Sequence, residues 1–295
     1  MEQCIRKAYA KINLGLDVVG RLPNGYHEVR MIMQTVGIYD VLTMKRIPAG
    51  IVVTTDHGEL PTDENNLIYK SAKLMLEEYG ITEGVQIHLE KHIPIAAGMA
   101  GGSTDAAATF IGMNQLFELN ASEEKLRELG VRVGADVPYC IMGGTALAEG
   151  IGEKLQKLPA APECWLLVAK PDINVSTKYV YEHLDAEGVK EHPDIDGMID
   201  ALKQGSLEGI VSRLGNVLEA VTAKKYPVIH EIKQCMLDTG AAGSLMSGSG
   251  PTVFGIFTEK EAAQRTLELI QEKRLAKQLF VTEFYNGSAK EGSLR

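Results

Sequence analysis

The sequence predicts an α/β protein with two domains, each of mixed α+β composition. At 295 residues the chain is longer than one hydrophobic core usually organises, since domains hold about 100 to 200 residues. Short runs typical of strands are interleaved with stretches typical of helices. The segment LPAAP, from Leu158 to Pro162, interrupts this pattern near the middle. We therefore expect a first domain at 1–160, a second domain at 161–287 and a polar tail at 288–295.

The first domain alternates strand and helix signals. Apolar residues recur at every second position in 51–55 and 85–90, which indicates half-buried strands. Helical spacing and glycine terminators predict helices at Asn66–Tyr79, at Asp105–Phe117 with Ser103 or Thr104 as N-cap, and at Ser122–Leu129. An α/β layer structure follows for this half of the chain.

The second domain begins with an apolar strand at Cys164–Ala169. Helical stretches are expected at Leu214–Ala223, Val228–Asp238 and Glu259–Arg274. A glycine-punctuated hairpin spans Gly243–Phe257, and the final strand is expected at Gln278–Tyr285. No internal repeat or low-complexity segment interrupts this order.

The amino-acid composition limits the classes of partner that this protein is expected to bind. A formal net charge of -9 argues against a protein that binds duplex nucleic acid, which would need a basic face. The four cysteines are widely separated and have no zinc-ligand or disulfide-framework spacing. The N-terminus lacks the pattern of a signal peptide, and no 18-residue apolar run occurs. We therefore expect a cytoplasmic protein that binds neither nucleic acid nor a membrane.

The strongest local signal is PIAAGMAGGSTD at 94–105, which follows a predicted strand and leads into an alanine-rich helix. Glycines allow backbone N–H groups to approach an anion closely, and the amino-terminal end of a helix favours negative charge. This arrangement predicts a phosphate-binding loop. A glycine turn that merely begins a helix is the alternative, and the segment matches neither the Walker spacing nor the GxGxxG spacing.

Three other segments carry polar groups at suggestive places. Lys11 and Asn13 share one face of a predicted strand, although Lys11 could simply be an exposed lysine. Asp136 lies in GADVP, where it could be an ordinary loop aspartate in a backbone restricted by the proline. The segment SGSGP at 247–251 forms a tight turn that a hairpin without any ligand also explains.

In this order and at these separations, the four segments resemble the motif set of the GHMP kinase superfamily, and the resemblance spans nearly the whole chain. Its most specific part is GRLPNGYH at 20–27. That segment resembles the members that phosphorylate a cytidine-diphosphate-linked methylerythritol in the non-mevalonate route to isoprenoid precursors. A mevalonate or homoserine kinase, or a non-catalytic nucleotide-binding protein of the same fold, is the alternative.

The resemblance implies an N-terminal domain like domain 2 of ribosomal protein S5, a ferredoxin-like C-terminal domain and an active cleft between them. It also implies ATP as the phosphoryl donor, Mg²⁺ accompanying it, and a small-molecule alcohol as acceptor. The magnesium ligands stay unassigned. The oligomeric state, monomer or homodimer, also stays open.

By motif position, the resemblance makes Asp136 the general base and Lys11 the cation that holds the reacting groups in register. The residues implied for ATP are Asn66, Leu67, Pro94, Ile95, Ala96, Ala97, Gly98, Met99, Ala100, Gly101, Gly102, Ser103 and Thr104. Those implied for the acceptor are Asn13, Tyr26, His27, Thr177 and Tyr181, with the two tyrosines on opposite faces of the cytosine. Met99, Ala100, Thr104 and Tyr181 depart from the residues common in the family.

Overall fold

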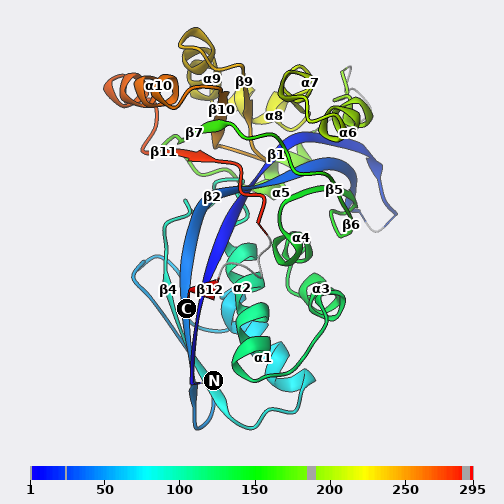
Figure 1. Ribbon diagram of the computed structural model, residues 1–295, viewed down its shortest axis with the longest axis vertical. Coiled ribbons are helices and arrows are strands. Elements are labelled where there is room, and N and C mark those ends of the chain that lie inside the picture. Colours follow the sequence, from blue (N-terminus) through cyan, green and yellow to red (C-terminus); the bar gives the residue numbers. More distant parts are fainter. Residues whose placement is uncertain (1, 24, 185–190, 288–292, 295) are drawn as a thin grey trace.

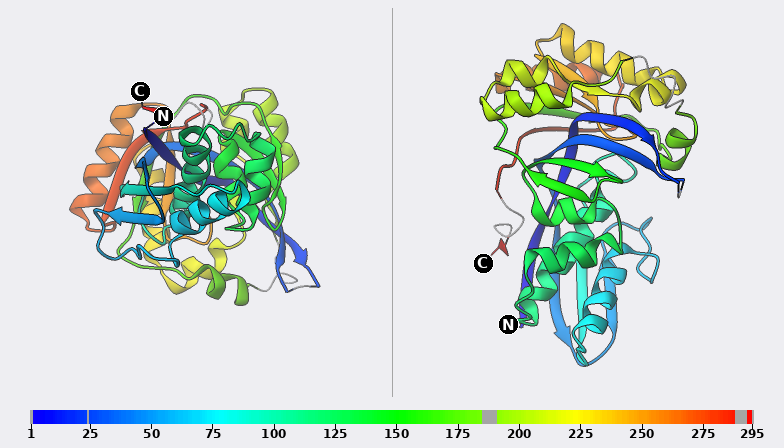
Figure 2. Two further views of the ribbon diagram at one scale, coloured as in Figure 1. Left: turned by 90° about the horizontal axis from the view of Figure 1, so that it is seen from below. Right: turned by 90° about the vertical axis from the view of Figure 1, so that its right-hand side faces the viewer.

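The computed structural model describes residues 2–23, 25–184, 191–287 and 293–294, which form two β-sheets flanked by helices. Figure 1 shows the first sheet with α1 to α4 in one part of the molecule and the second sheet with α9 and α10 in the other. The right-hand view in Figure 2 shows the same division into two layered units. The mixed α/β fold with two domains is therefore confirmed.

The strands are β1 (Gln3–Arg21), β2 (His27–Ile47), β3 (Ile51–Thr55), β4 (Gly84–Glu90), β5 (Thr145–Gly150), β6 (Lys154–Lys157), β7 (Trp165–Lys170), β8 (Gly215–Asn216), β9 (Gly243–Met246), β10 (Val253–Phe257), β11 (Gln278–Glu283) and β12 (Ser293–Leu294). The helices are α1 (Leu67–Glu78), α2 (Gly101–Leu116), α3 (Glu123–Val131), α4 (Val137–Met142), α5 (Thr177–Glu182), α6 (Ile195–Lys203), α7 (Leu207–Val211), α8 (Glu219–Lys225), α9 (Val228–Asp238) and α10 (Lys260–Glu272).

The first sheet is organised around the long antiparallel pair β1 and β2, which runs diagonally through Figure 1. The strand order is β12-β1-β2-β4-β3, and β5, β6 and β8 attach beside this path. Register shifts interrupt the β1–β2 ladder at three places, one of them between Tyr9 and Lys11. Such bulges bend a strand and re-aim its side chains, so β1 can serve both halves of the molecule.

The two faces of β1 have different surroundings. Ile12 and Leu14 are fully buried in a cluster that also contains Phe254 of the second sheet. Lys11 and Asn13 lie on the opposite face, where they line a cleft. The predicted sharing of one strand face by Lys11 and Asn13 is therefore confirmed, and the apolar face ties the two sheets together.

The second sheet has the order β11-β7-β10-β9 and is antiparallel throughout. With helices between β7 and β9 and α10 between β10 and β11, this is the βαββαβ arrangement of a ferredoxin-like fold. Ile232 of α9 and Ile270 of α10 pack with Leu167 of β7 in a separate buried cluster. The predicted ferredoxin-like second half is present.

Three boundary predictions were wrong. Helix α2 begins at Gly101 with Ala100 as N-cap, so Ser103 and Thr104 lie inside its first turn. The GADVP segment is not a loop throughout, because Asp136 is the N-cap of α4 and Pro138 fits its first turn. Gly215–Asn216 pairs with β1 as β8, a tertiary contact that overrides the local helical pattern expected from Leu214.

The domain boundary at residue 160 stays a prediction. The LPAAP seam does separate β6 from β7, but β8 and β12 return to the first sheet. Of the predicted tail, residues 288–292 and 295 lie outside the described residues, whereas Ser293–Leu294 pairs with β1.

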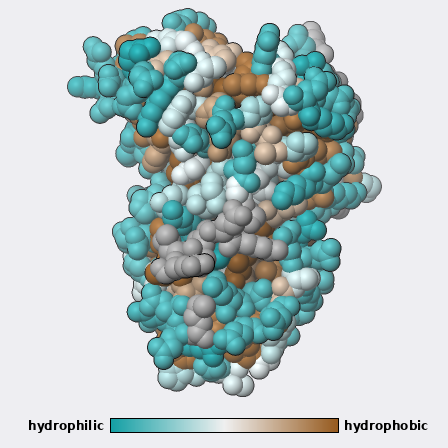
Figure 3. Space-filling view, in the orientation of Figure 1, coloured by the Kyte–Doolittle hydropathy of each residue, from teal (hydrophilic) through white to brown (hydrophobic). Residues whose placement is uncertain are grey.

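The molecular surface carries few large apolar side chains. The face shown in Figure 3 is mostly hydrophilic, with hydrophobic residues in small patches. Within the described ranges, the exposed large hydrophobic residues are Val19, Tyr26, Val52, Val131 and Leu237. No helix among the described residues has the length and apolar character needed to cross a membrane.

Candidate active site

A single cleft collects most of the residues predicted to form a site. Its walls come from β1, the loop before α2, the start of α4, α5 and the loop between β9 and β10. The predicted site residues that line it are Lys11, Asn13, Tyr26, His27, Asn66, Leu67, Pro94, Ile95, Ala96, Ala97, Gly98, Ala100, Gly101, Gly102, Ser103, Asp136, Thr177 and Tyr181. Segments far apart in sequence therefore meet at one place.

The loop before α2 has an unusual backbone. Ala96, Gly98 and Ala100 all have positive φ angles, of 51°, 72° and 56°. Left-handed residues at alternate positions are a feature of backbone turns whose N–H groups converge on an anion. The loop leads directly into α2, whose first N–H groups have no partners within the helix. The predicted phosphate-binding loop has the conformation that this chemistry needs.

The loop is braced from two sides. The backbone N–H of Lys11 donates a 3.2 Å hydrogen bond to the carbonyl of Met99, which attaches the loop to β1. The Ser247 hydroxyl donates a 3.0 Å hydrogen bond to the carbonyl of Gly98 from the β9–β10 turn. That turn is itself held by Asn216, whose side-chain amide donates to the carbonyls of Met246 and Gly248, both at 2.8 Å. The SGSGP segment is thus part of the site, and not only a hairpin turn.

Lys11 lies at the centre of the polar side chains. Its Nζ donates to Asn13 Oδ1 at 2.8 Å and lies 3.7 Å from Asp136 Oδ2. The lysine is buried, whereas the Asp136 side chain is about one-third exposed, at 31%, and faces the cleft. A carboxylate that is open to a cleft and oriented by a buried ammonium can accept a proton from a bound hydroxyl group. The structure therefore brings the two predicted catalytic residues together.

The cleft is also lined by aromatic residues. The rings of His27 and Tyr181 lie 5.1 Å apart with an interplanar angle of 32°, and Tyr26 is 61% exposed. Burial and the charge of Arg21 lower the pKa of His27, so its imidazole is neutral at neutral pH. The Thr177 hydroxyl is hydrogen-bonded to Ser249 at 2.9 Å, which holds α5 against the β9–β10 turn. These side chains therefore present flat aromatic faces and uncharged polar atoms to the cleft.

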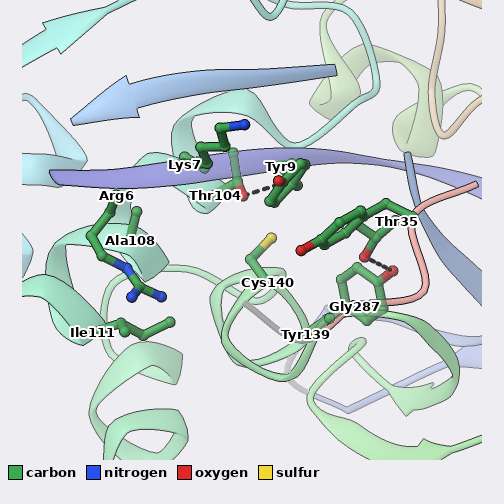
Figure 4. A pocket seen from close by; sticks show the side chains of 13 residues that line it. Arg6, Lys7, Tyr9, Thr35, Thr104, Ala108, Ile111, Tyr139, Cys140 and Gly287 are labelled. Carbon is green, nitrogen blue, oxygen red and sulfur yellow. Dashed lines mark hydrogen bonds between the residues drawn. The ribbon is translucent and has the colours of Figure 1, made fainter. Parts of the chain in front are cut away.

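Met99 and Thr104, both predicted to contact ATP, are not among the residues that line the cleft. The Met99 side chain is 1% exposed and packs in the core between the two sheets. Thr104 donates a 2.6 Å hydrogen bond to the carbonyl of Tyr9 and faces a small cavity on the other side of the loop (Figure 4). The same view shows Cys140 beside this cavity, and burial raises the pKa of its thiol, which keeps it in the unreactive protonated form.

Asn66 occupies its predicted place beside the cleft but also has a structural role. Its Oδ1 accepts a 2.8 Å hydrogen bond from the backbone N–H of Ile68, and its Nδ2 donates to the carbonyl of Pro61 at 2.6 Å. These two bonds cap α1 and fix the preceding loop, which lines the cleft at Leu60 and Pro61.

Sequence reasoning missed a buried charged cluster at the same cleft. Lys91 binds Asp40 and Asp105, and all three side chains are at most 5% exposed. One signal was available, because Asp40 interrupts an apolar run from Ile38 to Leu42 and charged residues are almost never fully buried unless paired. Its partners could not be read from the sequence, because they lie about 50 and 65 residues further along the chain.

Comparison with known proteins identifies the family. The model of the GHMP kinases N terminal domain matches residues 66–144, and that of the GHMP kinases C terminal domain matches residues 198–273. A 4-diphosphocytidyl-2-C-methyl-D-erythritol kinase of Lachnospira eligens is 56% identical, covering 97% of this chain and 99% of the relative. One from Clostridium perfringens is 47% identical, covering 96% and 98%.

Solved structures agree with this assignment. A crystal structure of 4-(cytidine 5'-diphospho)-2C-methyl-D-erythritol kinase has a TM-score of 0.82 and 31% identity, covering 96% of this chain and 100% of that chain. The homoserine kinase of Cytophaga hutchinsonii shares the fold, with a TM-score of 0.78 at 22% identity, covering 100% and 97%. The chain belongs to the GHMP kinases and, within them, to the family of the 4-diphosphocytidyl-2-C-methyl-D-erythritol kinases.

Proposed function

We propose that this ATP-dependent small-molecule kinase transfers the γ-phosphoryl group of ATP to the 2-hydroxyl of 4-diphosphocytidyl-2-C-methyl-D-erythritol. The product is the 2-phosphate, an intermediate of the non-mevalonate route to isoprenoid precursors. The observation that carries the proposal is the meeting of Lys11, Asp136 and the phosphate loop in one cleft, in a chain that is 56% identical to a kinase of that name.

In this proposal Asp136 accepts the proton of the 2-hydroxyl group, and Lys11 orients its carboxylate. A positioned base contributes about 10²- to 10⁴-fold to a rate. The rest of the acceleration comes from alignment and from charge stabilisation, because a loose phosphoryl-transfer transition state asks for little covalent help. Backbone N–H groups from Gly98 to Ser103 would bind the phosphate oxygens and hold the γ-phosphoryl group in line with the acceptor.

The acceptor's cytosine would lie between Tyr26 and Tyr181, with His27 reading the base edge through its backbone. Stacking of a base on an aromatic ring contributes about 1 to 3 kcal/mol. Asn13 would contact the polyol hydroxyl groups from its place beside Lys11. In the structure the Tyr181 ring lies against His27, so this arrangement requires the base to enter beside a ring pair that is already formed.

Magnesium is proposed to enter with ATP and to offset negative charge on the transferring phosphoryl group. Mg²⁺ in kinases is bound largely by phosphate oxygens and water, with one or two protein ligands. The described residues contain no group of three or more His, Cys, Asp or Glu side chains that could hold a metal ion. We assign no protein ligand to the ion.

A cytoplasmic location and the oligomeric state remain predictions. All four cysteines are buried free thiols, as expected in a reducing compartment.

The function is tested by measuring ADP release with magnesium and ATP on four acceptors at equal concentration. These are 4-diphosphocytidyl-2-C-methyl-D-erythritol, mevalonate, homoserine and galactose. Turnover restricted to the cytidylyl acceptor is the expected result. Turnover on another alcohol would overturn the substrate assignment, and silence on all four would favour a non-catalytic nucleotide-binding protein.

A further inference from the structure

Lys91 lies directly beneath the first residue of α2. A Cβ atom placed on Gly101 would come to 3.0 Å from Lys91 Nζ, so the ammonium packs against the backbone where the phosphate loop becomes helix. The Lys91 side chain is only 4% exposed, although both residues belong to the wall of the cleft. A buried positive charge therefore lies just behind the surface that would receive a phosphate group.

Two carboxylates hold this ammonium. Lys91 Nζ donates to Asp105 Oδ2 at 2.8 Å and to Asp40 Oδ2. Asp40 Oδ1 also accepts hydrogen bonds from the backbone N–H groups of His92 and Ile93, at 2.5 and 2.8 Å. The other oxygen of Asp105 is buried and has no hydrogen-bond partner. Asp40 is thus fully engaged, whereas Asp105 depends on Lys91.

The cluster has one more acid than base. Burial raises the pKa of Asp105, and the nearby Lys91 ammonium acts against this rise. The pKa of Lys91 is itself raised, because both carboxylates favour its charged form despite burial. Without the ammonium, two acids would lie uncompensated behind a loop that has to bind an anion, in a low-dielectric environment where charges interact strongly.

We infer that Lys91 is a positioning residue for ATP, because its ammonium offsets negative charge on Asp40 and Asp105 beneath Gly101 and so preserves the attraction of the first turn of α2 for the triphosphate. Lys91 acts through the charge of the cluster and not by contact with the nucleotide. The inference rests on the proposed function in one respect, namely that the loop binds ATP. It is independent of the acceptor and of the chemical step.

The test is calorimetric binding of ATP, ADP, AMP and adenosine, at constant magnesium and without any acceptor alcohol. Lys91→Met keeps a side chain of similar length and removes the charge. We expect ATP binding to weaken by roughly 10- to 100-fold, ADP and AMP progressively less, and adenosine hardly at all. The graded loss places the defect at the phosphate end of the site, because a defect of the whole fold would weaken all four ligands alike.

A second variant distinguishes charge from packing by the sign of its effect. Asp105→Asn removes an acid from the cluster with little change in shape, so ATP binding should tighten or stay the same relative to adenosine. A structural role predicts weakening, as in Lys91→Met. The double variant Lys91→Met/Asp105→Asn should recover part of the ATP affinity, and it serves the same comparison where Lys91→Met alone does not fold.

Lys73→Met is the matched control, since it removes one positive charge from an exposed position of α1 outside the cleft. It should leave the nucleotide series unchanged. A uniform loss across the four ligands, no loss for ATP, or weakening by Asp105→Asn would each overturn the inference. Failure of the acceptor assay with the graded nucleotide series intact would remove the proposed substrate and leave the role of Lys91 standing.

Discussion

A Cβ atom on Gly98 would lie 2.3 Å from the carbonyl oxygen of Ser247, closer than any real side chain approaches a backbone atom. The two residues are also joined by the hydrogen bond from the Ser247 hydroxyl to the Gly98 carbonyl. Gly98 has a φ angle of +72°. A residue without a side chain is therefore required here for two separate reasons, backbone conformation and close approach.

Gly98→Ala should lower the free energy of unfolding by about 3 kcal/mol or more and should abolish ATP binding. Neither backbone segment can move away cheaply, because β1 braces one of them and Asn216 the other. Chemical denaturation and nucleotide titration would measure the two effects.

Gly80→Ala is the control for this prediction. Gly80 also has a positive φ angle, +59°, but nothing lies within 4 Å of its Cβ position. Gly80→Ala should lower the free energy of unfolding by about 1 kcal/mol, the cost of the backbone conformation alone, and should leave ATP binding intact. Equal losses in the two variants would mean that the contact between Gly98 and Ser247 contributes nothing.

The elements predicted correctly are those whose pattern is local. Helix α9 matches its predicted range, and β4 was predicted from clean alternation of apolar and polar residues. Strand β2 was not predicted, and its residues from Met31 to Val36 are all buried, which erases the period of two in that part of the strand. Helices α5 to α7 are short, and their N-caps, Ser176, Asp194 and Ser206, were signals that could have been used.

For the site, the resemblance located residues that the structure then brought together, such as Lys11 and Asp136. The resemblance did not identify the residues that hold the loops of the site in place. Lys91 was not singled out because its role depends on Asp40 in β2 and Asp105 in α2, which only the fold places beside it. Likewise, the clamp of Asn216 on the β9–β10 turn depends on the pairing of β8 with β1.

Asp136→Asn should lower kcat by about 10²- to 10⁴-fold while the dissociation constants of ATP and acceptor change little. The amide keeps the size of the carboxylate but cannot take a proton. Steady-state kinetics together with calorimetric binding would separate the two quantities.

Asp172→Asn provides the comparison for that measurement. Asp172 pairs with Lys277 on the surface, at 3.1 Å, and lies outside the cleft. Its replacement should leave kcat unchanged. Near-normal turnover in Asp136→Asn would remove Asp136 from the role of general base and leave it an electrostatic guide at most.

Ala100→Gly should raise the free energy of unfolding by about 0.5 kcal/mol. Ala100 is held at φ 56°, where a residue with a Cβ atom is strained by about 1 to 2 kcal/mol. Glycine relieves this strain, but its greater conformational freedom in the unfolded chain offsets part of the stabilisation. Urea denaturation would measure the change. Ala107→Gly, in the interior of α2, should instead destabilise by about 1 kcal/mol, so equal destabilisation in both variants would contradict the predicted strain.

The pH dependence of stability should report on Asp105. Burial raises its pKa in the folded state, so below the unfolded pKa, about 3.9, both states are protonated and its contribution to stability is complete. As the pH rises from there, the unfolded state ionises first, and the contribution is lost until the pH passes the folded pKa. The asparagine side chain in Asp105→Asn does not titrate, so the variant does not lose stability in this way as the pH rises. The free energy of unfolding of the variant relative to the parent should therefore increase with pH above about 4, by at most about 1.4 kcal/mol per pH unit, and then level off.

Urea midpoints collected across this pH range would show the rise, whereas a difference that stays constant with pH would mean that Asp105 ionises as readily in the fold as in the unfolded chain.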